Sequence, residues 1–163
     1  MANLYVMCGA PGSGKSTFAK SLAKNRHALH VSRDIIRFSL LKNGESYFSH
    51  ESEVTDIFWN TINKALAAGQ NVIADQTSLN YRSRRYLLDH ISVPCKKYAI
   101  YMDVPYRVCR ERNSRRVGIT CVPEDKLRGM FNSFTIPSLK EGFDVIASVG
   151  EDNQLIIEEG DEE

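Results

Sequence analysis

The sequence lacks the features that mark several protein classes. No apolar run in its 163 residues approaches the roughly 20 that a membrane-spanning helix needs. The segment 1–9 has neither the basic stretch nor the small-residue cleavage site of a signal peptide. With 42% hydrophobic and 25% charged residues, the composition argues against a disordered chain, a collagen or a coiled coil. We therefore expect a single globular domain spanning residues 1–163 that does not associate with membranes.

Cysteine is scarce. The sequence contains four, at Cys8, Cys95, Cys109 and Cys121, with no C-x-x-C pair and no clustered histidines. This spacing argues against a zinc site and against a disulfide framework. We expect reduced thiols and a cytoplasmic protein.

The net charge of +1 conceals an uneven distribution. Residues 82–128 carry 12 Lys/Arg against 5 Asp/Glu, a local charge of +7, whereas residues 129–163 carry 1 against 9, a local charge of −8. The basic middle segment is a candidate for contact with a polyanion. Taken alone, the charges favour the plainer interpretation, which is two solvated faces of opposite sign.

Apolar segments of strand length alternate with segments of helical periodicity along the whole chain. We expect strands at residues 4–8, 28–32, 71–75, 98–104 and 143–149, with a short further strand at 154–157. We expect helices at residues 16–24, 34–42, 54–66, 81–91, 106–116 and 123–134. This order predicts an α/β three-layer sandwich, in which a parallel sheet of about five strands carries helices on both faces. Residues 106–122 would form a helical lid, and the acidic end at 158–163 would fray.

A phosphate-binding loop follows the first expected strand. Its sequence GAPGSGKS matches the pattern G-x-x-x-x-G-K-[ST] in full, between a strand and a helix. The glycines let backbone N–H groups turn towards an anion, Lys15 can reach the β- and γ-phosphates, and the Ser16 hydroxyl can ligate Mg²⁺. A plain turn would not account for the Lys-Ser pair. The predicted nucleotide-binding residues are Gly9, Ala10, Pro11, Gly12, Ser13, Gly14, Lys15, Ser16 and Thr17.

Carboxylates follow three other expected strands, and parallel strands end at one edge of the sheet. Asp34 and Arg37 lie three residues apart on an expected helix, so they share a face. The carboxylate could accept the proton of an attacking hydroxyl while the guanidinium holds an anionic acceptor; a helix N-cap with a salt bridge explains the spacing equally well. Asp75 ends its strand at the position of a Mg²⁺-binding carboxylate, although an ordinary turn residue can also stand there. Asp103 is a weaker candidate for binding the metal.

Arginines cluster in two places. Arg112 and Arg116 lie four residues apart in the expected lid, where they could neutralise charge on a transferring phosphoryl group. A solvated basic face is the alternative. The other cluster, Arg82, Arg84 and Arg85, is expected to be surface charge, with a lesser chance of contacting a nucleic-acid backbone.

Together these residues resemble the kinase domain of phage-type polynucleotide 5′-hydroxyl kinases, from the first strand to about residue 134. The likeness lies in the phosphate loop with Thr17, in Ser32-Arg33-Asp34 with Arg37, in Asp75 with Thr77 and Asn80, in Asp103-Val104-Pro105, and in Arg112-Asn113-Ser114-Arg115-Arg116 followed by Val122-Pro123. The bifunctional members also carry a phosphatase motif, D-x-D-G-T, which does not occur in this sequence.

The resemblance implies a P-loop kinase without the phosphatase activity, acting with ATP and Mg²⁺ on the 5′ end of DNA or RNA in nucleic acid repair. It implies that Asp34 is the general base, that Arg37 holds the acceptor's 3′-phosphate and that Arg116, with Arg112, is the lid arginine. Lys15 and Ser16 would bind the ATP phosphates and Mg²⁺, and Asp75 matches a further acidic active-site position.

Two alternative functions remain open. One is a P-loop kinase of a small molecule, such as a sugar, a nucleoside or a nucleotide-sugar. The other is a nucleotide-dependent switch or binding module, which has no evident need for Asp34, Arg37 and Arg116 together. The sequence points to no protein partner.

Overall fold

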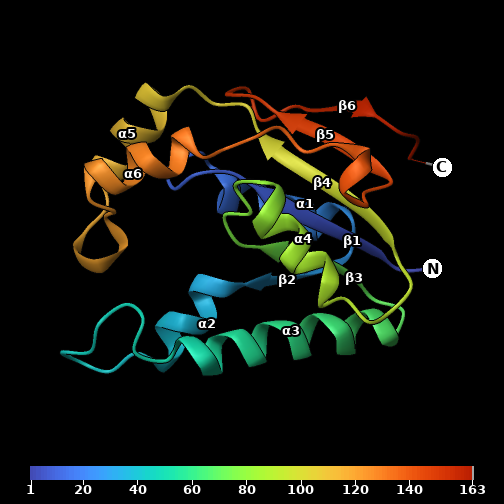
Figure 1. Cartoon of the computed structure of the whole chain (residues 1–163), viewed down its shortest axis with the longest axis horizontal. Coiled ribbons are helices and arrows are strands. Elements are labelled where there is room, and N and C mark those ends of the chain that lie inside the picture. The colour runs from blue at the N-terminus through green and yellow to red at the C-terminus, as the bar shows by residue number, and fades with distance from the viewer. Residues whose placement is uncertain (163) are drawn as a thin grey trace.

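A six-stranded sheet forms the middle layer of the molecule (Figure 1), whose computed structural model describes residues 1–162. The strand order is β2-β3-β1-β4-β5-β6. The strands are β1 (Asn3–Cys8), β2 (Ala28–Ser32), β3 (Asn71–Asp75), β4 (Lys96–Met102), β5 (Val145–Val149) and β6 (Leu155–Glu159). The first five pair in parallel, which confirms the predicted parallel sheet, and β6 pairs antiparallel with β5 and makes the sheet mixed.

The C-terminal hairpin corrects one expectation. The chain reverses after β5 through a turn in which the Asn153 N–H donates to the Gly150 carbonyl and Asn153 takes a positive φ of 59°. Glu158 and Glu159 therefore belong to β6 rather than to a frayed end, and Glu162 forms an ion pair of 2.7 Å with Arg26. Residue 163, the last of the expected acidic tail, lies outside the described residues.

Six α-helices connect the strands close to where the sequence predicts them. They are α1 (Lys15–Asn25), α2 (Arg33–Leu40), α3 (Glu51–Ala67), α4 (Tyr81–Asp89), α5 (Tyr106–Ser114) and α6 (Glu124–Asn132). Asn80 caps α4 as expected, because its side chain accepts from the Ser83 N–H while the Ser83 hydroxyl accepts from the Asn80 N–H. Helix α3 begins three residues earlier than expected, where Glu51 and Glu53 favour the positive end of the helix dipole.

Helices cover both faces of the sheet, which confirms the three-layer arrangement. Alternate residues of β1 point to opposite faces: Leu4 and Val6 belong to a buried cluster with residues of α3 and α4, and Tyr5 and Met7 to a cluster with residues of α1 and α5. Figure 1 shows α5 and α6 together at one end of the sheet, across from α2 and the loop that follows α2. This is the end where the parallel strands terminate. Among residues 1–162, no helix has both the length and the apolar character to cross a membrane.

Arg84 is not surface charge, contrary to the sequence-based expectation. Its side chain is fully buried, and its Nε lies 2.6 Å from Oε1 of Glu141, in the 3-10 helix η2 (Leu139–Glu141). Its remaining donors reach the Ser78 carbonyl and the carbonyl and hydroxyl of Thr135. Through its bond to the Ser78 carbonyl, Arg84 fixes the loop after β3. Ser78 has a φ of 44°, a conformation that an L-residue rarely adopts unless its surroundings hold it.

Breaking this pair should destabilise the protein strongly. We expect Glu141→Gln to lower the free energy of unfolding by roughly 3–5 kcal/mol, because it leaves the Arg84 charge buried and uncompensated. Urea denaturation would measure the change. In the control, Asp89→Asn removes the partner of Arg85 in an exposed pair and should cost below about 1 kcal/mol. Equal losses in the two variants would contradict the structural role given to Arg84.

Candidate active site

The phosphate loop joins β1 to α1 and is fixed by close packing. Gly12 and Gly14 have φ values of 81° and 86°, a backbone conformation that favours glycine. A Cβ on Gly12 would lie only 2.3 Å from the Cys109 carbonyl oxygen of α5, so no larger residue fits there. Helix α1 begins at Lys15 and directs its positive end at the loop. The loop therefore has the geometry of an anion-binding nest, as the sequence predicts.

Asp75 ties the loop to the neighbouring strand. Its Oδ1 lies 2.6 Å from the Lys15 ammonium, and its Oδ2 accepts hydrogen bonds from the Ser16 hydroxyl at 3.0 Å and from His30 Nε2 at 2.8 Å. Strand β3 pairs with β1 so that Asp75 stands opposite Met7, directly beside the loop. Burial alone would raise the pKa of the Asp75 carboxyl, but the His30 hydrogen bond and the Lys15 charge hold that pKa well below its usual range.

Sequence reasoning missed His30. This residue lies in β2, and it reaches Asp75 because β2 pairs with β3 at the edge of the sheet. A polar ring inside an otherwise apolar strand was the available signal. The identity of its partner depends on the strand order, which the sequence did not provide.

Asp34 and Arg37 share one face of α2, as their spacing predicts, with Nη1 of Arg37 2.6 Å from Oδ1 of Asp34. The salt bridge of the plainer interpretation is therefore present, but the N-cap is Ser32, whose hydroxyl accepts from the Ile35 N–H. The Arg37 side chain is only 4% exposed and also contacts Glu51, with Nη2 2.7 Å from Oε2. Arg37 thus bridges two carboxylates, whereas the Asp34 side chain remains 60% exposed.

Tyr47 completes this cluster and was not predicted. Its hydroxyl donates to Oδ1 of Asp34 at 2.5 Å and accepts from Nη1 of Arg37 at 2.8 Å. Burial, together with the hydrogen bond to Asp34, raises the pKa of the Tyr47 phenol, which keeps it protonated as a donor. Two donors therefore occupy Oδ1, while Oδ2 of Asp34 accepts no hydrogen bond from the residues that the structure describes. Tyr47 lies in the loop between α2 and α3, where no periodicity marks it.

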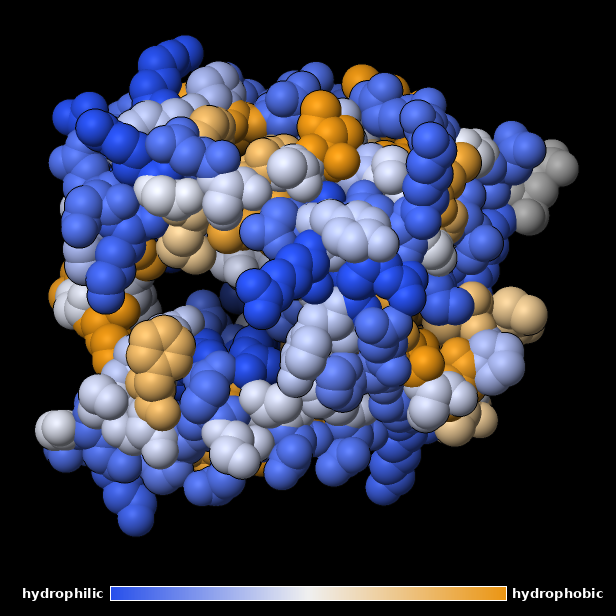
Figure 2. All heavy atoms as spheres, viewed as in Figure 1, coloured by the Kyte–Doolittle hydropathy of each residue, from blue (hydrophilic) through white to orange (hydrophobic). Residues whose placement is uncertain are grey.

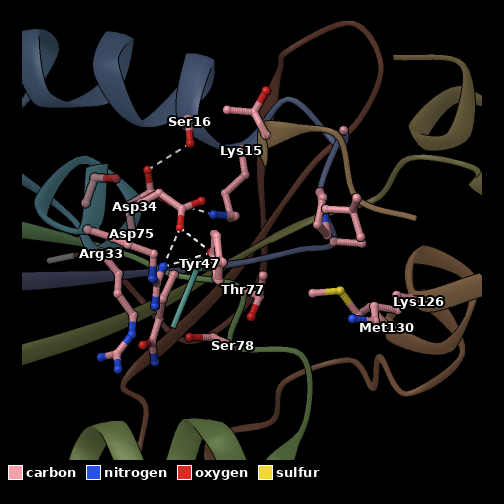
Figure 3. Close-up of a pocket in the computed structure, with 18 of the residues that line it drawn as sticks. Lys15, Ser16, Arg33, Asp34, Tyr47, Asp75, Thr77, Ser78, Lys126 and Met130 are labelled. Atoms are coloured by element: carbon pink, nitrogen blue, oxygen red, sulfur yellow. Dashed lines mark hydrogen bonds and ion pairs between the residues drawn. The ribbon is translucent and has the colours of Figure 1, made fainter. Parts of the chain in front are cut away.

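One cleft of about 1100 Å³ is lined both by the phosphate loop and by the carboxylates and arginine that the sequence predicts for the site. The phosphate loop lines it with Lys15 and Ser16, and Asp34, Arg37 and Asp75 line it as well. Figure 3 shows Lys15, Asp34, Asp75 and Tyr47 close together in this pocket. In Figure 2 the cleft is a hollow between the arm formed by α5 and α6 and the arm formed by α2 and the following loop. The Asp34 carboxylate on α2 therefore lines the same cavity as the phosphate loop.

The two arginines of the expected lid occupy different positions. Arg116 lies just beyond α5, is exposed and lines the cleft. Arg112 lies against the loop instead: a Cβ on Gly14 would be 3.1 Å from its Nη1. Asp103 lines a separate cavity of about 120 Å³ with Gly9 and Ser13. Of the two strand-end carboxylates considered for a metal, only Asp75 lines the main cleft.

The oxygen atoms beside the loop fit Mg²⁺. The Ser16 hydroxyl lies 3.0 Å from a carboxylate oxygen of Asp75, and both are hard donors of the kind that Mg²⁺ prefers. Within residues 1–162, no group of three or more His, Cys, Asp or Glu side chains could hold a metal ion. Magnesium sites at nucleotides use few protein ligands, since phosphates and water supply the others.

Comparison with known proteins agrees with the fold. Residues 4–137 match the family model AAA_33, described as an AAA domain. An L-seryl-tRNA(Sec) kinase of Methanococcus maripaludis is 27% identical over 146 residues, which cover 87% of this chain and 56% of that protein. A candidate bifunctional polynucleotide kinase/RNA ligase of Autographa californica nuclear polyhedrosis virus is 32% identical over 93 residues, 49% of this chain and 13% of that protein.

The solved structures show the same fold. In the Pnkp1/Rnl/Hen1 RNA repair complex, a chain matches 99% of this one over 50% of its own length, with a TM-score of 0.71 and 23% identity. The match covers little more than half of the seryl-tRNA kinase and far less of the viral protein. The architecture is that of P-loop kinases.

The Asp75 network should make stability depend on pH. We expect Asp75→Asn to lower the free energy of unfolding at pH 7 by about 2–4 kcal/mol, because Lys15 loses its charged partner. The folded-state pKa of Asp75 is depressed, so its contribution to stability is complete above the unfolded pKa of about 4 and is lost as the pH falls from there towards the folded-state pKa.

Urea denaturation from pH 7 down to pH 2 would measure this effect. The difference between wild type and Asp75→Asn should shrink as the pH falls. The exposed Asp56→Asn should show no comparable difference at any pH. A difference that stays constant with pH would contradict the ionised state assigned to Asp75.

Proposed function

The chain belongs to the AAA_33 family, and we propose that it is an ATP-dependent kinase that transfers the γ-phosphoryl group to the 5′-hydroxyl of a polynucleotide. One observation supports a transfer reaction above all. The Asp34 carboxylate, with one oxygen uncommitted, lines the same cleft as the phosphate loop. A switch or a simple nucleotide-binding module would not need a carboxylate at this position in the cleft.

The nucleotide would bind at the loop. Backbone N–H groups of the loop and the Lys15 ammonium would hold the β- and γ-phosphates, and Ser16 and Asp75 would hold Mg²⁺ directly or through water. The ion would neutralise charge that develops on the phosphate oxygens. Arg116 lines the cleft from the lid and would contact the transferring group when the lid closes.

The acceptor would bind beside Asp34. Its 5′-oxygen would attack the γ-phosphorus in line, forming a new O–P bond while the bond to the β-phosphate oxygen breaks and ADP leaves. Oδ2 of Asp34 would take the hydroxyl proton, because Tyr47 and Arg37 already occupy Oδ1. Arg37 would hold the acceptor's 3′-phosphate, as the resemblance implies. Its Nη2, which now contacts Glu51, would turn towards that phosphate.

The choice of a polynucleotide rests on two further supports. The relatives include proteins named for polynucleotide phosphorylation and for RNA repair. The segment 82–128, which carries the local charge of +7, supplies Arg82 and Arg116 to the lining of the cleft.

The decisive assay offers labelled ATP with 5′-hydroxyl oligonucleotides and, separately, with a panel of sugars and nucleosides. Transfer to a metabolite but to no oligonucleotide would refute the proposed acceptor.

Replacing the base should separate catalysis from nucleotide binding. We expect Asp34→Ala to reduce phosphoryl transfer at least 100-fold, because no other group takes the hydroxyl proton. The Kd for ATP, measured by titration calorimetry, should change less than about threefold, since Asp34 lies outside the phosphate loop. Residual transfer near the wild-type rate would exclude Asp34 as the base.

Removing the lid arginine should affect the chemical step. We expect Arg116→Ala to lower kcat by about 100-fold, the effect of losing one donor to a developing negative charge. Arg115→Ala is the matched control, because Arg115 is also exposed but pairs with Glu111 and does not line the cleft. If single-turnover measurements gave equal rates for the two variants, Arg116 would have no catalytic role.

A further inference from the structure

One wall of the cleft plays no part in the chemistry proposed above. Arg82 and Tyr86 both line the cleft and lie four residues apart on one face of α4. The buried residues of this helix, Arg84, Leu87 and Leu88, lie on its other side. In Figure 2, strongly hydrophilic side chains gather over α4 beside the hollow.

Tyr86 is an exposed ring with rigid support. Tyr86 is 55% exposed. The centroid of its ring nevertheless lies 4.4 Å from that of the His90 ring and 6.2 Å from that of the Trp59 ring. His90 in turn stacks on the buried Trp59 at 4.8 Å, and its Nδ1 donates to the Tyr86 carbonyl at 2.7 Å. A planar ring held in this way can stack on a base while losing little conformational entropy.

Arg82 is an available cation. It is exposed, and it has no hydrogen-bond or ion-pair partner in the part of the chain that the structure describes. The other two arginines on the α2 and α4 side of the cleft differ, since Arg33 and Arg37 both contact the Glu51 carboxylate. A guanidinium without a carboxylate partner, one helical turn from an exposed ring, fits a phosphate beside a base.

We propose that Arg82 and Tyr86 form a subsite for the second nucleotide of a single-stranded acceptor, with its base stacked on Tyr86 and the phosphate on its 3′ side, the next one after the phosphate given to Arg37, bound by Arg82. The proposal rests on the proposed function and adds a preference for length. We expect an acceptor of two or more nucleotides to extend from Asp34 to this wall of the cleft, and a mononucleotide placed at Asp34 to leave the wall empty. Because stacking is tolerant of base identity, the subsite favours single strands without selecting a sequence.

The test compares acceptors of different length. For each protein, kcat/KM is measured with a 5′-hydroxyl trinucleotide and with a nucleoside 3′-monophosphate, and the ratio of the two is the readout. We expect the wild-type ratio to be well above 1, and to fall about tenfold in Tyr86→Ala and in Arg82→Ala. Tyr86→Phe keeps the ring and should restore most of the ratio.

Matched control variants outside the cleft exclude a general effect of removing an exposed tyrosine or arginine. Tyr81→Ala removes an equally exposed tyrosine of α4, and Arg107→Ala an exposed arginine of α5, and neither residue lines the cleft. Both should leave the ratio unchanged. Binding of a 3′-labelled 5′-hydroxyl oligonucleotide, followed by fluorescence anisotropy with ADP present, should weaken about tenfold in Tyr86→Ala.

The outcomes distinguish this subsite from the proposed function. If the wild type transfers phosphate to oligonucleotides but its ratio is near 1, or if the Arg82 and Tyr86 variants keep the wild-type ratio, the subsite is refuted and the kinase activity stands. If the wild type phosphorylates no oligonucleotide at all, the proposed function fails and the subsite fails with it.

Discussion

The contact between Lys15 and Asp75 is the interaction on which the site depends. It joins the phosphate loop after β1 to the end of β3, and the same carboxylate also accepts from Ser16 and His30. The sheet order places β3 between β1 and β2, so one side chain can reach groups from both neighbours. The network holds a lysine, a carboxylate and a hydroxyl beside the phosphate loop, where the proposed triphosphate and metal ion would bind.

The proposed acceptor side is organised around a second carboxylate, Asp34. Arg37 and Tyr47 fix one oxygen of Asp34, and no described residue donates a hydrogen bond to the other. Glu51, in the first turn of α3, balances the charge of Arg37 and so ties the α2 helix to the start of α3. The loop between these helices thereby lines the cleft through Tyr47, and α4 lines it through Arg82 and Tyr86. The cleft is built by residues that are distant in sequence but follow neighbouring strands.

Local patterns predicted much of the fold and part of the site. Apolar runs and helical periodicity gave five parallel strands and six helices, and the loop motif with its flanking elements identified the nucleotide side. Spacing alone brought Asp34 and Arg37 together, since residues three apart share a helical face. Long-range pairing was not predictable. His30 and Glu51 act through contacts across strands and helices, and Arg84 seemed to be surface charge because its partner Glu141 lies 57 residues away.

The proposed reaction requires that the phosphate loop and the Asp34 carboxylate hold the γ-phosphoryl group and the 5′-oxygen in line for transfer. The most direct test is a crystal structure with a non-hydrolysable ATP analogue and a 5′-hydroxyl oligonucleotide. We expect the 5′-oxygen about 3–3.5 Å from the γ-phosphorus, in line with the leaving oxygen. We also expect Oδ2 of Asp34 within about 3 Å of the 5′-oxygen. A 5′ end bound away from Asp34, with the carboxylate still paired only with Arg37 and Tyr47, would contradict the proposed mechanism.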